Sequence, residues 1–440
     1  MKILSITLEQ MLAARERRAH IQNTMLQGGC CLVCLTMNIA GEIKRAPLIR
    51  LLFERGKAEF EALGLEVLDH REIDDVTGCE SFWLVQDDPA AVKTMLEQVE
   101  DSFDAARLFD FDVLVSGDGF PVKLSRNVSR RCLICDKPAA ECARSRSHGL
   151  DAVKAATGKL LADFGADALA DAAYNALMDE LRTTPKPGLV DLANNGAHDD
   201  MDVPLFERSA ESLKPYLRDA AKMGLAGCGM DELRARGLLA EREMFAATGG
   251  VNTHKGLIYS MGLILSGMGM ALKDPDADDE AITELAVRYA ADLAAADAES
   301  QLSRSLASPE TNGGKVLKTY GARGATGEAA AGFPDAVYCA ERLAQYREML
   351  GVDNKKAGVL AFCDSMARLE DTNLLHRGGQ AGLDFVKQEA SRISAMADID
   401  RRVSELTALD SELILRNLSP GGSADMLALA YLLDWFRSCF

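Results

Sequence analysis

The sequence predicts an α/β domain followed by an all-α domain, and three observations support this division. The chain has 440 residues, which is long for a single hydrophobic core. Strand-like apolar runs alternate with helical patterns up to about residue 153. From residue 154 onward, alanine, leucine and methionine recur at helical spacing and strand-like runs cease. We therefore expect domains at residues 1–153 and 154–440.

The first domain contains alternating helix and strand signals. Thr7 and Gln10 have the spacing of a capping box, so a helix is expected to follow them. Amphipathic spacing predicts two further helices, at residues 47–63 and 88–101. Short apolar runs, and one run that alternates apolar with acidic residues, predict four strands at residues 31–37, 66–68, 81–85 and 107–115.

The second domain has helical patterns separated by turns that are rich in glycine and proline. These turns lie at residues 184–188, 247–250, 312–314, 332–334, 377–379 and 419–422. The most apolar stretch of the domain, residues 256–272, contains glycines and methionines and is short for a membrane span of about 20 residues. We therefore expect this stretch to be a buried helix.

The overall composition restricts the classes of partner. The net charge is −18, from 49 basic and 67 acidic side chains. This argues against general binding to nucleic acid or to anionic membranes, which need a basic face, but it allows a small phosphate-bearing substrate. The eleven cysteines are sparse and odd in number, and the start of the sequence lacks a signal-peptide pattern. Reduced thiols and a cytoplasmic location are therefore expected.

Two acidic residues, Asp110 and Asp112, lie two positions apart in the expected strand 107–115. On a strand, this spacing directs both carboxylates to the same face. Neighbouring carboxylates repel each other, so a Mg²⁺ ion between them is one interpretation, and nucleotidyl-transfer folds hold the metal of a leaving pyrophosphate in this way. The alternative is a strand with one solvent-exposed face.

Four soft ligands follow within seventeen residues, namely Cys132, Cys135, Cys142 and His148. They could form a tetrahedral Zn²⁺ site, although the later spacings differ from those of a standard zinc finger. The alternative is a set of small buried cysteines. Several arginines surround this segment and make it locally basic, as expected either of a site for an anionic substrate or of a solvated loop.

Five glycine-containing loops in the second domain carry side chains that bind metals, phosphates or protons. Their residues span 185–202, 248–256, 313–324, 371–379 and 419–425. None has the spacing of a P-loop, but backbone N–H groups of Gly-Gly turns at helix starts can bind phosphate. A glycine before a helix is often only a turn or a cap. However, three of the six histidines, His198, His254 and His376, lie in these loops.

The first domain resembles the apo-citrate lyase phosphoribosyl-dephospho-CoA transferases, the holo-acyl-carrier-protein synthases of citrate lyase. The matching segments are residues 107–114, 130–135 and 142–148, with Ile43-Lys44 as a weaker match because Ala40-Gly41-Glu42 replaces the prolines of the family. The resemblance implies a nucleotidyltransferase-like fold and transfer of a phosphoribosyl-dephospho-CoA group to a serine of an apo acyl carrier protein, with loss of pyrophosphate. It favours the Mg²⁺ interpretation of Asp110 and Asp112, and it suggests that Lys44 and Arg107 contact the substrate.

The second domain resembles the triphosphoribosyl-dephospho-CoA synthases along nearly its whole length. The resemblance rests on Pro-Lys-Pro-Gly-Leu-Val-Asp, Gly-Ala-His-x-Asp-Met, Gly-Val-Asn-Thr-His-Lys-Gly, Gly-Ala-Arg-Gly and Ser-Pro-Gly-Gly-x-Ala-Asp, at residues 185–191, 196–201, 250–256, 321–324 and 419–425. It implies that a ribose hydroxyl of 3′-dephospho-CoA attacks the anomeric carbon of ATP, that adenine leaves and that the triphosphate is retained.

This glycosyl transfer needs a base for the hydroxyl, a proton for adenine and Mg²⁺ on the phosphates. The hypothesis for these roles is a set of acidic residues that bind Mg²⁺ or act as the base, with histidines beside them: Asp200, Asp202, Asp364, Asp371, Asp425, His198 and His254. The expected phosphate ligands are basic side chains and glycine N–H groups: Lys186, Lys255, Lys315, Arg323, Arg377, Gly249, Gly250, Gly421 and Gly422.

The favoured interpretation is therefore a bifunctional enzyme that makes and then transfers the prosthetic group of citrate lyase. The equivalent pair of enzymes for malonate decarboxylase is one alternative, and the cysteine-histidine segment favours the citrate lyase type. A non-catalytic assembly factor that holds the carrier protein or the coenzyme is a second alternative. A kinase is disfavoured because P-loop and kinase signatures are missing from the sequence.

Overall fold

The computed structural model describes residues 5–117, 120–307 and 312–440. Contacts between Cα atoms divide the chain into two compact units. Unit 1 comprises residues 1–165, 272–280 and 439–440, and unit 2 comprises residues 166–271 and 281–438. The division falls inside one long helix, α5 (Leu150–Arg182), and each unit is described by itself.

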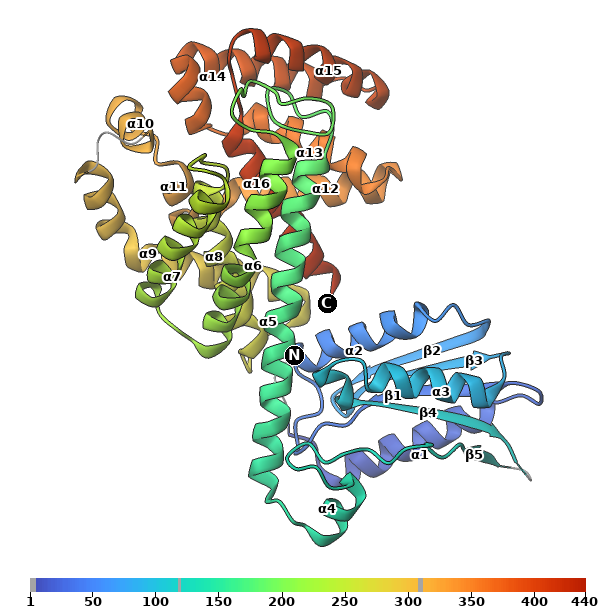
Figure 1. The fold of residues 1–440 in the computed structure, drawn as a ribbon. Coiled ribbons are helices and arrows are strands. Elements are labelled where there is room, and N and C mark those ends of the chain that lie inside the picture. Colours follow the sequence, from blue (N-terminus) through green and yellow to red (C-terminus); the bar gives the residue numbers. More distant parts are fainter. Residues whose placement is uncertain (1–4, 118–119, 308–311) are drawn as a thin grey trace. The chain divides into compact units, whose positions relative to one another are not determined.

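Unit 1 contains a five-stranded antiparallel sheet with the strand order β2-β3-β1-β4-β5 (Figure 1). The strands are β1 (Cys31–Met37), β2 (Val67–Asp75), β3 (Gly78–Val85), β4 (Phe109–Ser116) and β5 (Pro121–Lys123). The helices are α1 (Leu8–Met25), α2 (Pro47–Glu61), α3 (Pro89–Glu100), the short 3₁₀ helix η1 (Asp104–Leu108) and α4 (Ala139–Ser145). The mixed α/β character expected of the first domain is thus present.

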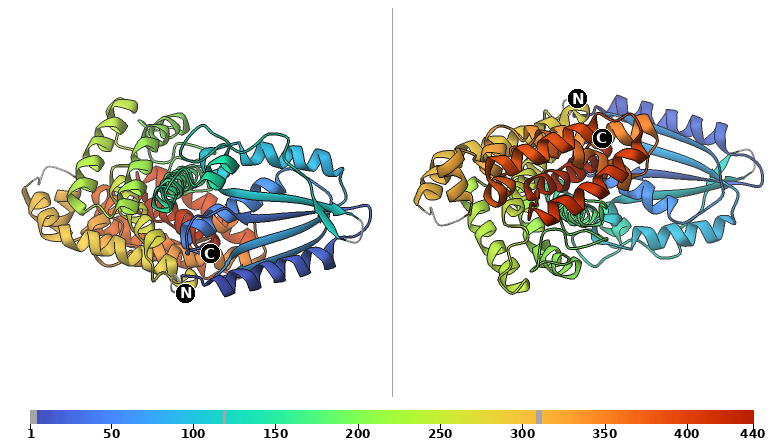
Figure 2. Two further views of the ribbon diagram at one scale, coloured as in Figure 1. Left: turned by 90° about the horizontal axis from the view of Figure 1, so that it is seen from below. Right: turned by 90° about the horizontal axis from the view of Figure 1, so that it is seen from above.

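Helices cover both faces of this sheet (Figures 1 and 2). Met25 of α1 packs on Leu32, Phe82 and Leu114 from three strands. On the opposite face, Phe60 of α2 stacks on Trp83 with ring centroids 4.1 Å apart. Successive side chains of a strand point to opposite faces, and both faces are covered, so β3 is buried along its whole length and β1 over its first five residues.

Most of the helices and strands of unit 1 were predicted from local sequence patterns. The capping box of Thr7 and Gln10 forms at the start of α1, as predicted. Strand β2, however, continues to Asp75, whereas the sequence suggested only residues 66–68. The reason is its position at the edge of the sheet, where polar and charged side chains are tolerated and hide the strand signal.

The described part of unit 2 consists of helices joined by loops, as predicted. Its helices after α5 are α6 (Val203–Ala226), α7 (Met230–Ala247), α8 (Lys255–Lys273), α9 (Ile282–Ala307), α10 (Asn312–Tyr320), α11 (Gly324–Ala330), α12 (Pro334–Leu350), α13 (Asn354–Arg368), α14 (Thr372–Ser394), α15 (Ile399–Leu415) and α16 (Gly421–Ser438). The short 3₁₀ helix η2 (Asp279–Ala281) lies between α8 and α9, at the end of the segment 272–280 that belongs to unit 1. Two expected turns differ: residues 312–314 begin α10, and residues 377–379 form a kink inside α14 at Gly379.

The apolar stretch 256–272 forms α8, as expected. Within the described residues, α8 alone has the length and composition of a membrane span, and 78% of its apolar window is buried inside the protein. Its glycines explain this burial, because a Cβ atom at Gly267 would lie 2.2 Å from the Ala286 carbonyl oxygen. The missing side chain lets α9 approach closely, so α8 is a core helix of the all-α unit.

Candidate functional sites

Asp110 and Asp112 lie on β4, where the alternating pattern exposes them and buries Phe109 and Phe111. The strand pairs with β1 in a register that places Asp110 opposite Thr36 and Asp112 opposite Cys34. Both carboxylates therefore project from the sheet face that α1 covers, beyond the end of its apolar core. Their side chains remain 40% and 26% exposed, so a ligand can reach them.

Basic side chains surround this carboxylate pair. Arg130 lies 3.2 Å from an Asp110 oxygen, and Lys123 forms an ion pair with Asp112. Together with Lys93 they line a pocket of about 340 Å³. Burial raises the pKa of Asp112, and the neighbouring Asp110 raises it further, against the effect of Lys123. A divalent cation would relieve this repulsion, so the pair fits a Mg²⁺ site.

Glu100, which the sequence did not single out, organises the basic residues of this pocket. Its side chain is almost fully buried and accepts a hydrogen bond from the Phe111 backbone N–H at 2.8 Å. It also accepts charge-assisted hydrogen bonds from Arg126 and Arg130. A buried carboxylate must be paired, and this pairing holds two arginines beside β4. Its position at the end of an amphipathic helix gave no signal of this role.

The other two residues suggested for the first domain have structural contacts. Lys44 is half-buried and its ammonium group donates to the Ile39 carbonyl oxygen, while burial lowers the pKa of Lys44. Arg107 donates to the carbonyl oxygens of Arg131 and Cys132, at 3.2 and 2.9 Å. Arg107 thus stabilises the segment that carries the cysteines, and it lines a cavity of about 1120 Å³ formed with that segment.

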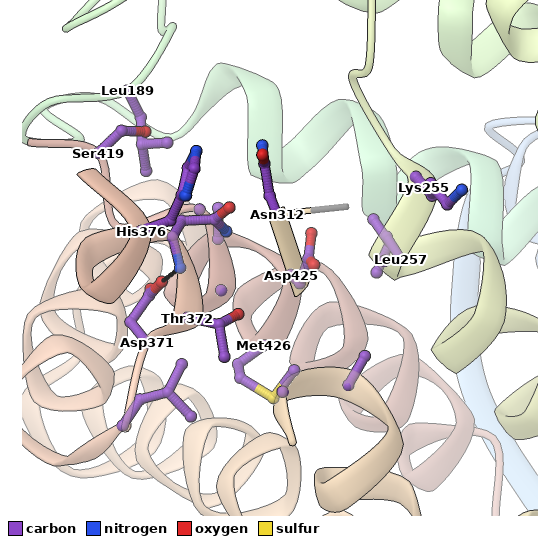
Figure 3. Close-up of a pocket in the computed structure, with 18 of the residues that line it drawn as sticks. Leu189, Lys255, Leu257, Asn312, Asp371, Thr372, His376, Ser419, Asp425 and Met426 are labelled. Carbon is purple, nitrogen blue, oxygen red and sulfur yellow. Dashed lines mark hydrogen bonds between the residues drawn. The ribbon is translucent and has the colours of Figure 1, made fainter. Parts of the chain in front are cut away.

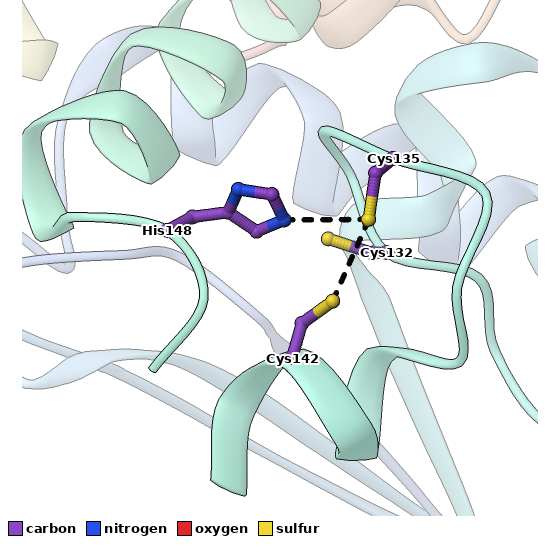
Figure 4. Close-up of side chains that lie close together, drawn as sticks. All are labelled: Cys132, Cys135, Cys142 and His148. Atoms are coloured by element: carbon purple, nitrogen blue, oxygen red, sulfur yellow. Dashed lines mark hydrogen bonds between the residues drawn. The ribbon is translucent and has the colours of Figure 1, made fainter. Parts of the chain in front are cut away.

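The structure brings Cys132, Cys135, Cys142 and His148 together (Figure 4). One ligand atom from each of the four lies within 4.8 Å of the others. Cys135 Sγ is 3.5 Å from Cys142 Sγ and 3.3 Å from His148 Nε2. Among the described residues, no other three Cys, His, Asp or Glu side chains meet this criterion. The spacing alone did not establish this proximity.

Unit 2 contains a pocket of about 780 Å³ formed by loops and helix starts from across its sequence. Eleven of the residues predicted from the motifs line it: Lys186, His198, Asp200, His254, Lys255, Arg323, Asp371, Arg377, Gly421, Gly422 and Asp425. Figure 3 shows His376, Lys255 and Asp425 among the side chains that line this pocket. All five glycine-containing loops of the second domain contribute residues to this pocket.

Two predicted acidic residues lie outside this pocket and have other partners. Asp202 caps α6, since its carboxylate accepts the Leu205 N–H at 2.8 Å. Asp364 is buried in α13, where Arg342 and Tyr346 donate to it at 2.6 and 2.7 Å. Neither is among the described residues that line the pocket. Their carboxylates stabilise the fold, and a role for either in Mg²⁺ binding or catalysis stays a prediction.

Three of the expected phosphate ligands also lie outside the pocket lining. Lys315 is exposed on α10, which replaces the expected glycine loop. Gly249 and Gly250 form the turn between α7 and α8, both with positive φ, and the Gly250 N–H donates to the Phe245 carbonyl oxygen. These glycines serve the turn geometry, so the structure gives no support for phosphate binding at them.

Asp371 lines the pocket, but hydrogen bonds within the protein occupy both of its oxygens. Oδ1 accepts the N–H groups of Asn373 and Leu374 at the start of α14. Oδ2 accepts the N–H group and the hydroxyl of Ser423 at 2.9 and 3.2 Å. Asp371 therefore caps one helix and ties the start of α16 to it, and its expected role as a Mg²⁺ ligand stays a prediction.

Two of the three loop histidines that line the pocket, His198 and His254, have lowered pKa values and are neutral at ordinary pH. Burial, and then the charge of Arg377, lower the pKa of His198 to about 4. Arg377 donates to His198 Nδ1 at 3.1 Å, so Nε2 carries the hydrogen that it donates to Ser419 Oγ at 2.9 Å. Burial, and then Lys186, likewise lower the pKa of His254 to about 4. Neutral histidines cannot bind phosphate by charge, but they orient their neighbours.

Asp425 and Glu180 form an acidic centre at the bottom of the pocket. Burial raises the pKa of Asp425 well above its usual range, and the nearby charges of Glu180 and Asp371 raise it further. Glu180 is buried and forms an ion pair with Lys186, which is itself 2% exposed. Glu180 was not among the predicted residues, because the neighbouring Asp179 and Arg182 are also charged and the pattern does not distinguish it.

Glu328 is a second acidic residue that the sequence analysis missed. It lines the pocket from α11 and accepts the N–H groups of Asp335 and Ala336 at 2.7 and 3.1 Å. Burial, with a further contribution from Asp335, raises the pKa of Glu328 to about 7. A carboxyl group with this pKa can exchange a proton near neutral pH.

Comparison with known proteins relates both units to enzyme families. Residues 166–439 match the ATP:dephospho-CoA triphosphoribosyl transferases, and residues 6–164 match the apo-citrate lyase phosphoribosyl-dephospho-CoA transferases. A protein of Haemophilus influenzae named protein CitXG is 34% identical and aligns over 98% of this chain and 97% of its own length. The chain belongs to the ATP:dephospho-CoA triphosphoribosyl transferase family. It is a fusion of this family with the apo-citrate lyase phosphoribosyl-dephospho-CoA transferases.

Relatives that match mainly the triphosphoribosyl transferase part carry a consistent name. A Vibrio cholerae protein, probable 2-(5''-triphosphoribosyl)-3'-dephosphocoenzyme-A synthase, is 42% identical over 59% of this chain and 85% of its own length. A Haemophilus ducreyi 2-(5''-triphosphoribosyl)-3'-dephosphocoenzyme-A synthase is 34% identical over 67% of this chain and 97% of its own length. The chain is therefore a transferase, bifunctional and concerned with the prosthetic group of citrate lyase.

Proposed function

We propose that the two activities are divided between the predicted domains. Residues 154–440 make 2'-(5''-triphosphoribosyl)-3'-dephospho-CoA from ATP and 3'-dephospho-CoA and release adenine. Residues 1–153 transfer the phosphoribosyl-dephospho-CoA group to a serine of the apo acyl carrier protein of citrate lyase and release pyrophosphate. The observation that carries the proposal is the presence of a separate polar pocket in each unit, each lined by the motif residues of its own family match.

In the synthase pocket, two carboxyl groups have proton affinities suited to glycosyl transfer. Glu328, with a pKa raised to about 7, is our candidate for the base that takes the proton of the attacking ribose hydroxyl. Asp425, whose pKa burial raises well above its usual range, is our candidate for the donor to the leaving adenine, rather than a Mg²⁺ ligand. Burial raises the pKa of Glu180, and the Lys186 ammonium group acts against this shift. In its carboxylate form, Glu180 would stabilise the oxocarbenium-like transition state.

The triphosphate needs positive charge in the same pocket. Lys255 and Arg323 line it, and Asp200 has a 63% exposed side chain at its rim. A bound Mg²⁺ ion keeps several water ligands and also binds phosphate oxygens, so one or two carboxylates from the protein suffice to hold it. Asp200 is our candidate for such a carboxylate ligand. When bound, Mg²⁺ neutralises phosphate charge and orients the chain of phosphates. Gly421, at the start of α16, would direct its backbone N–H group at the same phosphates, whereas the Gly422 N–H is directed at the Asp371 carboxylate.

In the transferase pocket, Asp110 and Asp112 would hold the Mg²⁺ that supports the leaving pyrophosphate. Arg130, Lys123 and Lys93 line the same pocket and would bind phosphate oxygens. The serine hydroxyl of the carrier protein attacks the phosphorus that remains on the phosphoribosyl group, and the bond to pyrophosphate breaks. This arrangement is similar to that of nucleotidyltransferases, which is the fold type we propose for unit 1.

The proposal is tested with the purified chain. ATP, Mg²⁺ and 3'-dephospho-CoA are incubated with it, and free adenine is measured by chromatography. Apo acyl carrier protein of citrate lyase is then added, and its intact mass is followed for attachment of the prosthetic group. Adenine release that fails over a range of Mg²⁺ and pH would exclude the synthase, and an unchanged carrier mass in the presence of the intermediate would exclude the transferase.

Two alternatives are separate outcomes of the same assay. Labelling of the carrier protein of malonate decarboxylase in preference to that of citrate lyase would change the proposed partner. Tight carrier binding without adenine release or labelling would indicate an assembly factor.

We propose a cytoplasmic location because ATP and 3'-dephospho-CoA are intracellular substrates and the eleven cysteines of the chain form no disulfide in the structure.

A further inference from the structure

We propose that Cys132, Cys135, Cys142 and His148 bind one structural Zn²⁺ ion, and that this ion holds the arginine-bearing segment of unit 1 beside Asp110. The inference concerns a metal separate from the Mg²⁺ of catalysis. Its link to activity rests on the proposed transferase function, but the metal site itself does not.

The four side chains match the ligand chemistry and the size of a zinc site. Three thiols and one imidazole are a common closed set for structural zinc, with Zn–S bonds of about 2.3 Å. The edge of such a tetrahedron is about 3.8 Å, which follows from that bond length. The separations of 3.5 Å between Cys135 and Cys142 and of 3.3 Å between Cys135 and His148 are close to that edge. Figure 4 shows the four side chains converging on one region.

The chain that presents the first two ligands is a tight backbone loop. Cys132 donates its N–H to the Lys137 carbonyl oxygen at 2.8 Å, and Ala139 donates to the Arg130 carbonyl oxygen at 2.8 Å. The Ile134 N–H points at Cys132 Sγ, at 3.5 Å. Backbone N–H groups directed at a sulfur atom stabilise a thiolate, and they orient it as a ligand. The loop is therefore built around its cysteines.

The segment also needs a cross-link, because it has almost no hydrophobic core. Between residues 120 and 156, all of which the structure describes, Cys142 is the one buried residue. The segment nevertheless keeps a defined loop, a short helix and the start of α5 close together. Small units without sufficient apolar burial commonly depend on a metal or a disulfide, and the cysteines here are free thiols.

The same segment supplies groups to the carboxylate pocket. Arg130 extends from the loop to Glu100 and to Asp110, while Arg107 donates to the carbonyl oxygens of Arg131 and Cys132. Metal at the four ligands would fix the loop backbone and with it the position of the Arg130 guanidinium. Loss of the metal would therefore impair the transfer reaction and leave the synthase pocket of unit 2 intact.

The first test measures metal content and needs no activity. The full chain, purified without chelator under reducing conditions, is expected to contain about one Zn²⁺ per chain by elemental analysis. After removal of Zn²⁺, addition of Co²⁺ should produce the intense near-ultraviolet thiolate-to-cobalt absorption of a tetrahedral site. Cys132→Ser and Cys142→Ser should lower the zinc content at least about tenfold, whereas Cys30→Ser, a control outside the cluster in the same unit, should keep it.

The second test compares the two activities of the same variants. Cys142→Ser should lose carrier labelling at least about tenfold and keep adenine release within about twofold of the wild type. A zinc-containing wild type without carrier labelling would contradict the proposed transferase function but not the metal site. The site itself is excluded if the reduced chain binds neither Zn²⁺ nor Co²⁺, or if thiol mapping finds a disulfide between Cys135 and Cys142 in protein that has never bound metal.

Discussion

The Asp112 carboxylate on β4 lies at a position where an ionised group lowers the stability of the fold. Burial and the neighbouring Asp110 both raise the pKa of Asp112, so the ionised form costs folding free energy near neutral pH. Local repulsion of this kind is typical of functional sites, where the fold accepts a cost for a charge that binds a ligand. The stability and the activity of a variant at this residue should therefore change in different directions.

We expect Asp112→Asn to reduce carrier labelling at least about 100-fold, because an amide is a poor Mg²⁺ ligand. Its thermal midpoint should equal or exceed that of the wild type, because the repulsion with Asp110 is removed. Labelling by mass spectrometry and differential scanning calorimetry measure the two effects. Asp69→Asn, an exposed aspartate on edge strand β2, should change neither. A loss of activity that accompanies a large loss of stability would contradict this interpretation.

His254 is buried as a neutral side chain, with its Nδ1 2.7 Å from Ser209 Oγ. Its folded pKa of about 4 is below the ordinary value of 6.5, so the unfolded chain binds the proton first as the pH falls. The stabilisation is fully present above pH 6.5 and is lost progressively as the pH falls towards 4. The change amounts to about 3 kcal/mol at most, from the size of this pKa shift.

When the pH is lowered from 7 to 4.5, the urea concentration at the unfolding midpoint of unit 2 should decrease. We expect this decrease to be smaller in His254→Asn than in the wild type. The chain has two tryptophans, Trp83 in unit 1 and Trp435 in unit 2, so a Trp83→Phe background lets fluorescence follow unit 2. His20→Asn, an exposed histidine, is the control and should behave as the wild type. Identical pH profiles for His254→Asn and the control would contradict this assignment.

At the scale of elements, the loop after α5 depends on contacts with α15 and the residues that follow it. Gly188 adopts φ +74°, and its N–H donates to Asp410 of α15 at 2.8 Å. A Cβ atom at Gly188 would lie 2.4 Å from the Leu418 carbonyl oxygen, which is backbone and cannot move aside. Glycine at this position thus permits both the left-handed conformation and the close approach that carries Lys186 into the pocket.

We expect Gly188→Ala to destabilise unit 2 more than Gly227→Ala. Gly227 has a similar φ of +71°, at the end of α6, but a Cβ atom there would meet nothing within 4 Å. Gly227→Ala should therefore cost about 1 kcal/mol from backbone strain, whereas Gly188→Ala should cost at least about 2 kcal/mol more. Urea unfolding followed by circular dichroism measures both. Equal losses in the two variants would mean that the steric contact is unimportant.

At the scale of the whole molecule, each unit has its own pocket, lined by its own residues. If the intermediate made by the synthase is released into solution, one chain can carry out the synthase reaction and a second chain can carry out the transfer reaction. Asp425→Asn should lose adenine release and keep the transfer of added intermediate, whereas Asp112→Asn should show the reverse.

We expect neither variant alone to label the carrier protein from ATP and 3'-dephospho-CoA, and a mixture of the two to label it. The mixture should show a lag, because the intermediate must first accumulate, and the wild type at equal concentration is the reference. Mass spectrometry of the carrier measures the labelled fraction over time. A mixture that stays inactive while each variant retains its own half-reaction would contradict free exchange of the intermediate.

The sequence by itself determined the secondary structure of most elements, because side-chain periodicity and caps are local properties. It also determined the families, because loops such as residues 185–191 keep a distinctive order of residues. Strand β2 is an exception, since its polar edge position is a property of the sheet. The alternation that directs Asp110 and Asp112 to one face of β4 was likewise readable from spacing alone.

Only the tertiary structure decided which of the candidate residues act together. It placed Glu180 beside Asp425 and Glu100 beside Arg130, and the sequence analysis had identified neither glutamate. It also gave Asp371 a capping role, since both of its oxygens accept hydrogen bonds from the protein. Such relationships depend on packing between segments that are distant in the chain, whereas residue patterns report only on neighbours within a few positions. Burial, which sets the pKa of each buried carboxyl group, exists only once those segments have packed.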